Sequence, residues 1–214
     1  MLDVGTPSDP FLRLHIPSEN SSKSPYTTLS HCWGTLKIKR LTKANMISLL
    51  TSIEISELPK TFQHAIIITR RLGLRYLWID SLCIIQDSFQ DWAQESARMG
   101  EIYKNCFCNI AAAAALDGRY GCFMAKNTIL AKYCRVRISN CATGSDSAIF
   151  NLVPRMLWKL HLDNYPLGRR AWVVQEKFLA PRILHFGKNQ LFWECHDLVR
   201  QSWIPFPQDF QLTS

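Results

Sequence analysis

The stretch YLWIDSLCIIQDSFQDWAQESARMGEIYKNC (residues 76–106) decides the fold class of this chain. Its first five residues, YLWID (76–80), are aromatic and apolar and are bounded by polar residues, which is typical of a central β-strand. Ser88, followed three residues later by Asp91, predicts an N-terminal helix cap. Apolar residues then recur at helical spacing to about Lys104, which predicts an amphipathic helix. A buried strand followed by a helix is the basic unit of an α/β fold.

The segments on either side repeat this alternation. Pro59 suits the first turn of a helix that ends at Gly73, and YTTLS (26–30) further upstream predicts a short buried strand. Downstream, FCNIAAAAA (107–115) predicts another buried strand, although alanine by itself favours helix. Strands separated by helices at this spacing predict a mostly parallel sheet flanked by helices.

The remainder of the chain is irregular until a predicted helix, RRAWVVQEKFLA (169–180). Two segments after it, 182–187 and 190–196, predict a β-hairpin, and CRVRIS (134–139) before it predicts an edge strand. We therefore expect one domain with an irregular insertion, preceded by an extension and followed by a tail, in the order 1–25 (N-terminal extension), 26–196 (domain, insertion about 122–165) and 197–214 (C-terminal tail).

Length and composition exclude several classes of protein. The 214 residues, 47% of them hydrophobic, suffice for one domain with a substantial core. Neither a signal peptide nor a membrane-spanning apolar run is recognisable, so we expect a cytoplasmic protein with no membrane partner. The eight cysteines include no CxxC pair and several lie in apolar segments, so we expect reduced thiols and no metal site.

The net charge of +8 arises mainly in the second half of the chain. The Lys and Arg residues there are dispersed among apolar residues, with no dense basic run. This pattern favours a solvated basic face, and next a site for a nucleotide-sized anion. It makes nucleic-acid binding the least favoured partner class.

Candidate site residues lie where predicted strands end, because ligands of open parallel sheets bind beyond the carboxyl ends of the strands. Asp80 ends an apolar strand, and a desolvated carboxylate there caps the next loop, pairs with an arginine or contacts a ligand. His31 is also a polar residue where a strand ends, and such a residue serves more often as a hydrogen-bonding group of the fold than as a catalyst. Trp33 either fills core space or stacks on a base, and Gly34 suits the tight turn after the strand.

Glu176 is the second candidate carboxylate. It follows Trp172 by four residues on the predicted helix, so both lie on one face at the boundary of the core. A surface ion pair with a neighbouring arginine is the alternative. Glu95 is a weaker candidate, because Arg98 lies three residues further on as an ion-pair partner. A Cys–His nucleophile pair stays open without a supporting motif, with either of two cysteines (Cys32 or Cys83).

Four segments, taken in order, resemble the HET (heterokaryon incompatibility) domain family of fungi. They are YTTLSHCWG (26–34), the stretch LPKTFQHA…EIYKNC (58–106), NIAAAAALDGRYG (109–121) and PLGRRAWVVQEKFLAPRILHFGKNQLFWEC (166–195). The most specific motifs are LWID…CIIQD…DW and RAWVVQE…LHF. The stretch 122–165 matches little, and the chain ends soon after WEC, where members of the family usually continue.

The resemblance implies a domain of self/non-self recognition that triggers regulated cell death. HET domains are remotely similar to TIR domains, which implies a flavodoxin-like sheet with a C-terminal helix and hairpin added, and NAD as a substrate rather than a bound cofactor. In that comparison RAWVVQE is similar to the TIR segment that carries the catalytic glutamate, so Glu176 takes that role. The residues implied to hold the dinucleotide are those after the first strands, with the helix tryptophan (Ser30, His31, Trp33, Gly34, Asp80 and Trp172).

Three hypotheses of function follow. The first is an NAD glycohydrolase, in which one carboxylate stabilises the positive charge on the ribose. The second is a non-enzymatic scaffold that acts as a homo-oligomer or recruits recognition or effector domains through exposed aromatic side chains. The third, a nucleic-acid binder, rests only on the basic second half.

Overall fold

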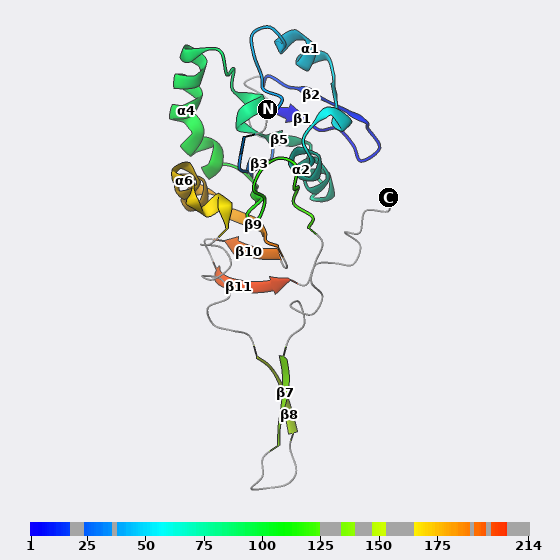
Figure 1. Cartoon of the computed structure of the whole chain (residues 1–214), viewed down its shortest axis with the longest axis vertical. Helices are drawn as coiled ribbons and strands as arrows, with labels where there is room; N and C mark the ends of the chain where they lie inside the picture. The colour runs from blue at the N-terminus through cyan, green and yellow to red at the C-terminus, as the bar shows by residue number, and fades with distance from the viewer. Residues whose placement is uncertain are drawn as a thin grey trace.

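A computed structural model describes residues 1–17, 24–35, 38–124, 134–139, 147–152, 165–188, 191–195 and 198–204. For residues 134–139, 147–152, 171–172 and 198–204 it describes the backbone alone. One nine-stranded sheet runs through the molecule, and β7 (Cys134–Ser139) pairs with β8 (Ser147–Leu152) in a separate two-stranded ribbon (Figure 1). The chain is therefore an α/β protein, and CRVRIS is a strand of that ribbon rather than an edge of the main sheet.

Four neighbouring strands at the centre of the sheet are parallel, in the order β9-β6-β3-β5. They are β3 (Tyr26–Ser30), β5 (Tyr76–Trp78), β6 (Cys108–Ala111) and β9 (Arg182–Phe186). The strand predictions at these four places are confirmed. Because the four strands run in one direction, their carboxyl ends meet at one edge of the sheet.

Antiparallel strands extend this centre on both sides, so the sheet is mixed. Five of its pairings are antiparallel and three are parallel, and the prediction of a mostly parallel sheet is wrong. The added strands are β1 (Leu2–Asp3), β2 (Phe11–Leu14) and β4 (Ile53–Glu54) beyond β5, and β10 (Leu191–Cys195) and β11 (Leu198–Ile204) beyond β9. Three of the antiparallel pairings join consecutive strands by short connections, and β1–β5 and β2–β4 join segments far apart in the chain, so none of them leaves a strand–helix–strand pattern in the sequence.

Both ends of the described chain belong to this sheet. Leu2, Leu12 and Leu14, from the stretch predicted to be an N-terminal extension, are buried in the core. β11 comes from the predicted C-terminal tail. The predicted C-terminal hairpin is present as β9 and β10, but β9 also pairs with β6 and is thus an integral part of the parallel centre.

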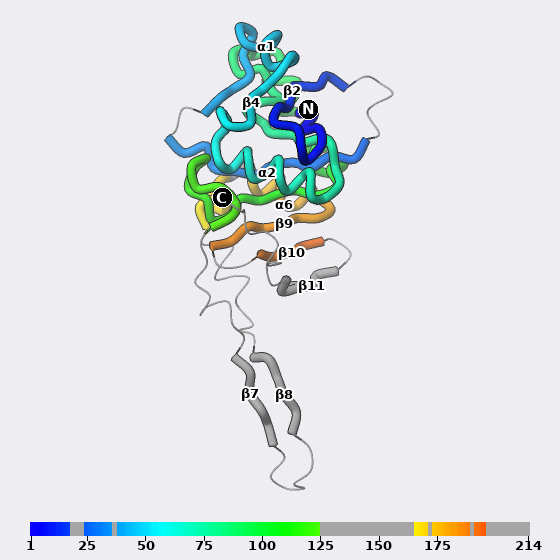
Figure 2. The backbone as a smooth tube through the Cα atoms, turned by 90° about the vertical axis from the view of Figure 1, so that its right-hand side faces the viewer, coloured from blue at the N-terminus to red at the C-terminus, as the bar shows by residue number. Residues whose placement is uncertain are grey.

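Helices cover the two faces of the sheet (Figure 2). α2 (Lys60–Arg71) packs on one face, and α4 (Phe89–Lys104) and α6 (Ala171–Leu179) lie side by side on the other. Gly100 of α4 lets these two helices approach closely, since a Cβ there would lie 3.4 Å from side-chain atoms of Gln175 and Leu179. The predicted cap is confirmed, because the Ser88 hydroxyl accepts a hydrogen bond from the backbone N–H of Asp91.

Shorter elements complete the fold: α1 (Met46–Thr51), η1 (Ile55–Glu57), α3 (Asp80–Cys83) and η2 (Pro166–Arg169). β6 is shorter than the predicted strand 107–115, since the chain turns after Ala111 and the N–H of Ala113 bonds back to the Ala111 carbonyl. Within the described ranges, no helix is long and apolar enough to cross a membrane.

Candidate functional site

The carboxyl edge of β3 and β5 brings most of the predicted site residues together. β3 and β5 are neighbours in the sheet, so the segment that begins at Ser30 lies beside the segment that begins at Asp80. The polar loop 116–121, after β6, meets the same edge, because the glycine of the β3 exit packs against Asp117. The three segments that leave strands at this edge are thus adjacent in space.

Asp80 accepts two hydrogen bonds at this edge. Trp33 Nε1 donates to Oδ2 over 3.0 Å, and the backbone N–H of Ser81 donates to Oδ1 over 2.7 Å. The first of these fixes the loop after β3 against the start of α3. The Asp80 side chain is still 23% exposed, so its oxygens can also be reached by a ligand.

His31 is buried beside this carboxylate. Its Nε2 lies 3.9 Å from Asp80 Oδ1 and has no hydrogen-bond partner among the described residues. Burial lowers the pKa of His31, so the imidazole is neutral at pH 7. Its ring packs edge-on against Phe62 of α2, and its carbonyl accepts a hydrogen bond from Arg170 Nη1.

Gly34 has the backbone conformation that its predicted role requires. Its φ is +62°, and a Cβ at this position would lie 2.5 Å from the Cβ of Asp117. Glycine therefore allows both the tight exit from β3 and the close contact with the loop after β6.

We expect Gly34→Ala to lower the free energy of unfolding by about 1–3 kcal/mol more than Gly73→Ala does, because overpacking costs this much. Gly73 has the same left-handed conformation, at φ +72°, but no atom lies within 4 Å of a Cβ placed on it. The two variants thus share the backbone strain and differ in the clash. Urea unfolding of both variants measures this difference. Equal losses of unfolding free energy would show that the loop after β3 is not packed against the loop after β6.

Glu176 projects from α6 toward the carboxyl edge. Its side chain is buried, with the residue 6% exposed, and its Oε2 has no hydrogen-bond partner among the described residues. Neither Arg169 nor Arg170, which precede the helix, lies within ion-pair distance of Glu176. The alternative of a surface ion pair with a neighbouring arginine is therefore not realised among the described residues. Glu95, by contrast, pairs with Arg98 over 3.1 Å.

The surroundings of Glu176 raise the pKa of its carboxyl to about 7. Burial is the largest cause, and the negative charge of Asp80 acts in the same direction. The hydroxyls of Ser30 and Tyr103 and the positive charge of Arg170 lower the pKa in part. Near neutral pH the carboxyl is therefore divided between its protonated and ionised forms.

A buried polar network forms the floor beneath Glu176. Asn109 of β6 accepts from the Thr28 hydroxyl over 3.0 Å and donates from Nδ2 to Ser30 Oγ over 2.9 Å. All three side chains are at most 2% exposed. Because these buried groups are hydrogen-bonded to one another, the network holds their side chains in a defined geometry.

Three residues of this site were not predicted from the sequence. Asn109 is a single polar residue in an apolar strand, which is the one signal that could have indicated it. Tyr103 belongs to the apolar stripe of α4, and its burial against Glu176 depends on the packing of two helices. Arg170 was considered only as an ion-pair partner of Glu176. The backbone of Trp172 lies in α6, but its side chain is outside the described part of the structure.

The cysteines of the site are poor nucleophiles. Burial raises the pKa of both Cys32 and Cys83, so neither thiol is ionised at neutral pH. The alternative of a Cys–His nucleophile pair is therefore disfavoured. Among the described residues, no group of three or more His, Cys, Asp or Glu side chains is arranged to hold a metal ion.

Two cavities lined by described residues adjoin the sheet. One of about 320 Å³ lies between α6 and strands β3, β6 and β9, and Ser30 lines it. The other, of about 930 Å³, lies beside α4, and its lining includes two weaker candidates, Cys83 and Glu95, but neither Glu176 nor Asp80.

The model of one protein family, described as heterokaryon incompatibility protein (HET), matches residues 26–176 of the chain. The match begins at the first residue of β3 and ends at Glu176. No curated protein and no solved structure matches the chain.

Proposed function

Because the chain belongs to the heterokaryon incompatibility (HET) family, which gives it a heterokaryon incompatibility-type function, we propose that it promotes regulated cell death by cleaving NAD, with Glu176 as the catalytic carboxylate. The observation that carries this proposal is a buried carboxyl whose Oε2 has no partner, at the sheet edge where ligands of α/β proteins bind. A TIR-like arrangement of the fold is part of the same proposal.

In the proposed reaction the bond between C1′ of the ribose and the nitrogen of nicotinamide breaks, and its electron pair leaves with the nicotinamide. The ribose carries the resulting positive charge until water adds to C1′ and releases a proton. The products are ADP-ribose and nicotinamide. The ionised carboxylate of Glu176 stabilises the cation, which is the charge that develops in the transition state.

The environment of Glu176 suits a cation that exists only briefly. Burial makes an unpaired carboxylate costly in the free enzyme, and a positive charge nearby removes that cost. The attraction between the carboxylate and the ribose cation is therefore strongest in the transition state, where the cation forms, as catalysis requires. Asp80 adds a second negative charge on the same side.

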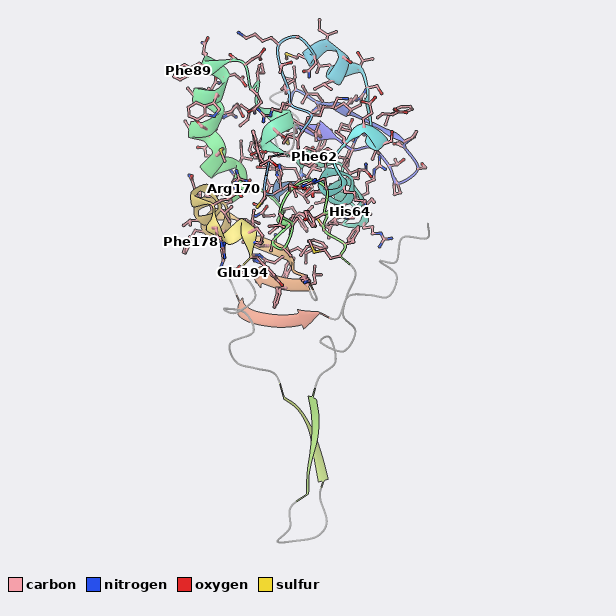
Figure 3. The ribbon with its side chains drawn as sticks, viewed as in Figure 1. Phe62, His64, Phe89, Arg170, Phe178 and Glu194 are labelled. Atoms are coloured by element: carbon pink, nitrogen blue, oxygen red, sulfur yellow. The ribbon has the colours of Figure 1, made fainter. Side chains whose placement is uncertain are left out.

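The residues after β3 and β5 are assigned to binding the dinucleotide. In this assignment Trp33, held in place by its hydrogen bond to Asp80, offers a face for stacking, and Gly34 leaves space for backbone approach. Ser30, His31 and Trp172 complete the proposed binding set. Arg170, labelled in Figure 3, directly precedes α6 and donates a hydrogen bond to the His31 carbonyl. It is a positive group available for the pyrophosphate.

We expect kcat/KM for NAD cleavage to rise about tenfold per pH unit below pH 7 and to level off above it. The reason is that only the ionised form of Glu176 can stabilise the cation, and the pKa of its carboxyl is about 7 in the free enzyme. Initial rates of nicotinamide release between pH 5.5 and 8.5, at NAD concentrations far below KM, measure this profile. The range extends about 1.5 pH units to either side of the pKa of Glu176. A rate that is flat or falls over this range would contradict the assignment.

The alternative is a scaffold that kills by self-association. The observation that favours it is a stacked pair on α4, Phe89 and Trp92, which are 82% and 47% exposed. In this case cells die with normal NAD levels, and Phe89→Ala with Trp92→Ala abolishes both killing and association. Cellular NAD measured before loss of viability separates the two functions.

A further inference from the structure

A cavity that Glu176 does not line lies on the sheet face that α6 covers. This cavity of about 320 Å³, which we call the α6 cavity, is bounded by the helix and by β3, β6 and β9. Its floor includes Asn109 and Ala111 of β6 and, beside them, Ile183 and His185 of β9. Alternate residues of a strand point to the same face, and β6 pairs with β9, so these side chains form one surface beneath the helix.

The helix α6 forms the wall opposite this floor and the mouth of the cavity. Val174 and Phe178, the latter labelled in Figure 3, line the cavity and are still 54% and 71% exposed. The α6 cavity is therefore open to solvent along the helix, and a ligand can enter it without unfolding of the domain. Its volume is at the lower end of the range for ligand pockets, about 300–1,000 Å³, which favours a small ligand.

Asn109 presents a hydrogen-bond donor in the floor of the α6 cavity. Its Nδ2 carries two hydrogens and donates one of them to Ser30 Oγ over 2.9 Å, while its Oδ1 accepts from the Thr28 hydroxyl. Among the residues that the structure describes, none accepts the second hydrogen, although Asn109 is 1% exposed. A buried donor without an acceptor is unfavourable, so this group favours a ligand that brings an acceptor.

The charge of the α6 cavity is positive. Of its described lining residues, Lys177 is the one that is charged, and no acidic side chain is among them. The Lys177 ammonium has three donors, so a contact elsewhere leaves others for a ligand. His185 is neutral, because burial lowers its pKa, and its Nε2 lies 2.8 Å from Glu194, outside the lining. The polar groups of the cavity thus match an anion.

We propose that the α6 cavity binds a small carboxylate with an apolar body. The carboxylate accepts hydrogen bonds from Lys177 and from the second hydrogen of Asn109 Nδ2, and the apolar body packs between Val173 of the helix and Ile183 of the sheet. This site goes beyond the proposed function and needs no contact with Glu176. Because the ligand contacts both α6 and the sheet, it stabilises the packing of the helix on the sheet.

The first test compares benzoate with benzamide, which has the same shape and no charge. Ligand-observed NMR titration of the whole chain measures both dissociation constants. We expect benzoate to bind about tenfold more tightly, since hydrogen bonds to a charged group are stronger than those between neutral groups. Lys177→Gln should remove this preference, whereas Lys104→Gln, which changes an exposed lysine of α4 outside the lining, should keep it.

A second pair of variants places a negative charge at the mouth without disturbing the core. Val174→Glu and Val174→Gln have side chains of the same size at an exposed position, and they differ in charge. We expect benzoate to bind Val174→Glu about fivefold more weakly than Val174→Gln, as repulsion between nearby like charges implies. Benzamide should bind both variants equally.

Hydrogen exchange locates the ligand. Saturating benzoate should slow the exchange of amides in α6 of the wild type, because the bound ligand holds the helix on the sheet. This result, with the two expected losses of benzoate affinity, supports the site whether or not the chain cleaves NAD. Equal affinity for benzoate and benzamide, unchanged affinity in Lys177→Gln and Val174→Glu, unchanged exchange in α6, or no benzoate binding to the folded wild type overturns it.

Discussion

Cells that express the Glu176→Gln variant are expected to survive and keep their NAD, whereas cells that express the wild-type chain lose NAD and die. The substitution keeps the size of the side chain and removes its negative charge. Removing one group that stabilises transition-state charge typically lowers kcat by about 100- to 1,000-fold. Cells that express the variant are therefore expected to consume NAD far more slowly than cells that express the wild type.

Glu95→Gln is the matched control for this experiment. It makes the same chemical change on α4, where the carboxylate pairs with Arg98 at the surface. We expect it to kill and to deplete NAD like the wild type. Killing by Glu176→Gln at the same expression level would exclude the carboxylate from the function. Measurement of NAD and of colony survival in one inducible yeast strain gives both results.

The Glu176→Gln variant is also expected to be more stable than the wild type at pH 8, by about 2–4 kcal/mol. The folded wild type holds a carboxyl whose pKa is about 7, whereas the ordinary pKa of an exposed glutamate is about 4.5. Each pKa unit corresponds to about 1.4 kcal/mol. The ionised, buried and unpaired carboxylate thus destabilises the fold, and a neutral amide does not.

The raised pKa of Glu176 determines the pH range over which the wild type and Glu176→Gln differ in stability. Because the folded-state pKa is raised, the folded protein binds more protons than the unfolded chain between about pH 4.5 and 7. The contribution of Glu176 to stability is fully present below this window and is lost as the pH rises through it. Wild type and Glu176→Gln should therefore be similarly stable at pH 4.5 and diverge up to pH 7.

Urea unfolding of both proteins at several pH values measures the divergence. Glu95→Gln again serves as the control, since it removes a surface ion pair worth less than about 1 kcal/mol. If the unfolding free energies of wild type and Glu176→Gln differed by the same amount at every pH, the carboxyl would not be buried in its ionised form. A gain in stability together with a loss of activity is the expected trade-off at a functional site.

The parallel centre of the fold could be predicted because each of its strands is a short run with a helical segment before or after it in the chain. The antiparallel additions could not. β1 has only two residues, and its pairing with β5 is a long-range contact that no local pattern encodes. For the same reason β9 looked like one arm of a hairpin, although it also pairs with β6. Local periodicity indicates which segments are strands, and packing of the whole chain decides their partners.

The two carboxylates of the site could be proposed from sequence because each follows an apolar pattern where a charge is costly. The groups around Glu176 could not be proposed in this way. Tyr103 lies near it only because α6 packs against α4, and Asn109 belongs to the site only through its hydrogen bond to Ser30 on the neighbouring strand. The cavity of about 320 Å³ between α6 and the sheet has no counterpart in any local sequence pattern, since residues from three strands, α6 and η2 line it.

The central claim is that Glu176 enables this domain to cleave NAD. Release of nicotinamide from NAD by the purified chain at pH 8, with Glu176→Gln and Glu95→Gln alongside, tests it most directly. The account predicts nicotinamide and ADP-ribose in equal amounts from the wild type and from Glu95→Gln, and a rate about 100- to 1,000-fold lower from Glu176→Gln. No release from folded wild type at high protein concentration, or equal rates from all three proteins, would contradict it.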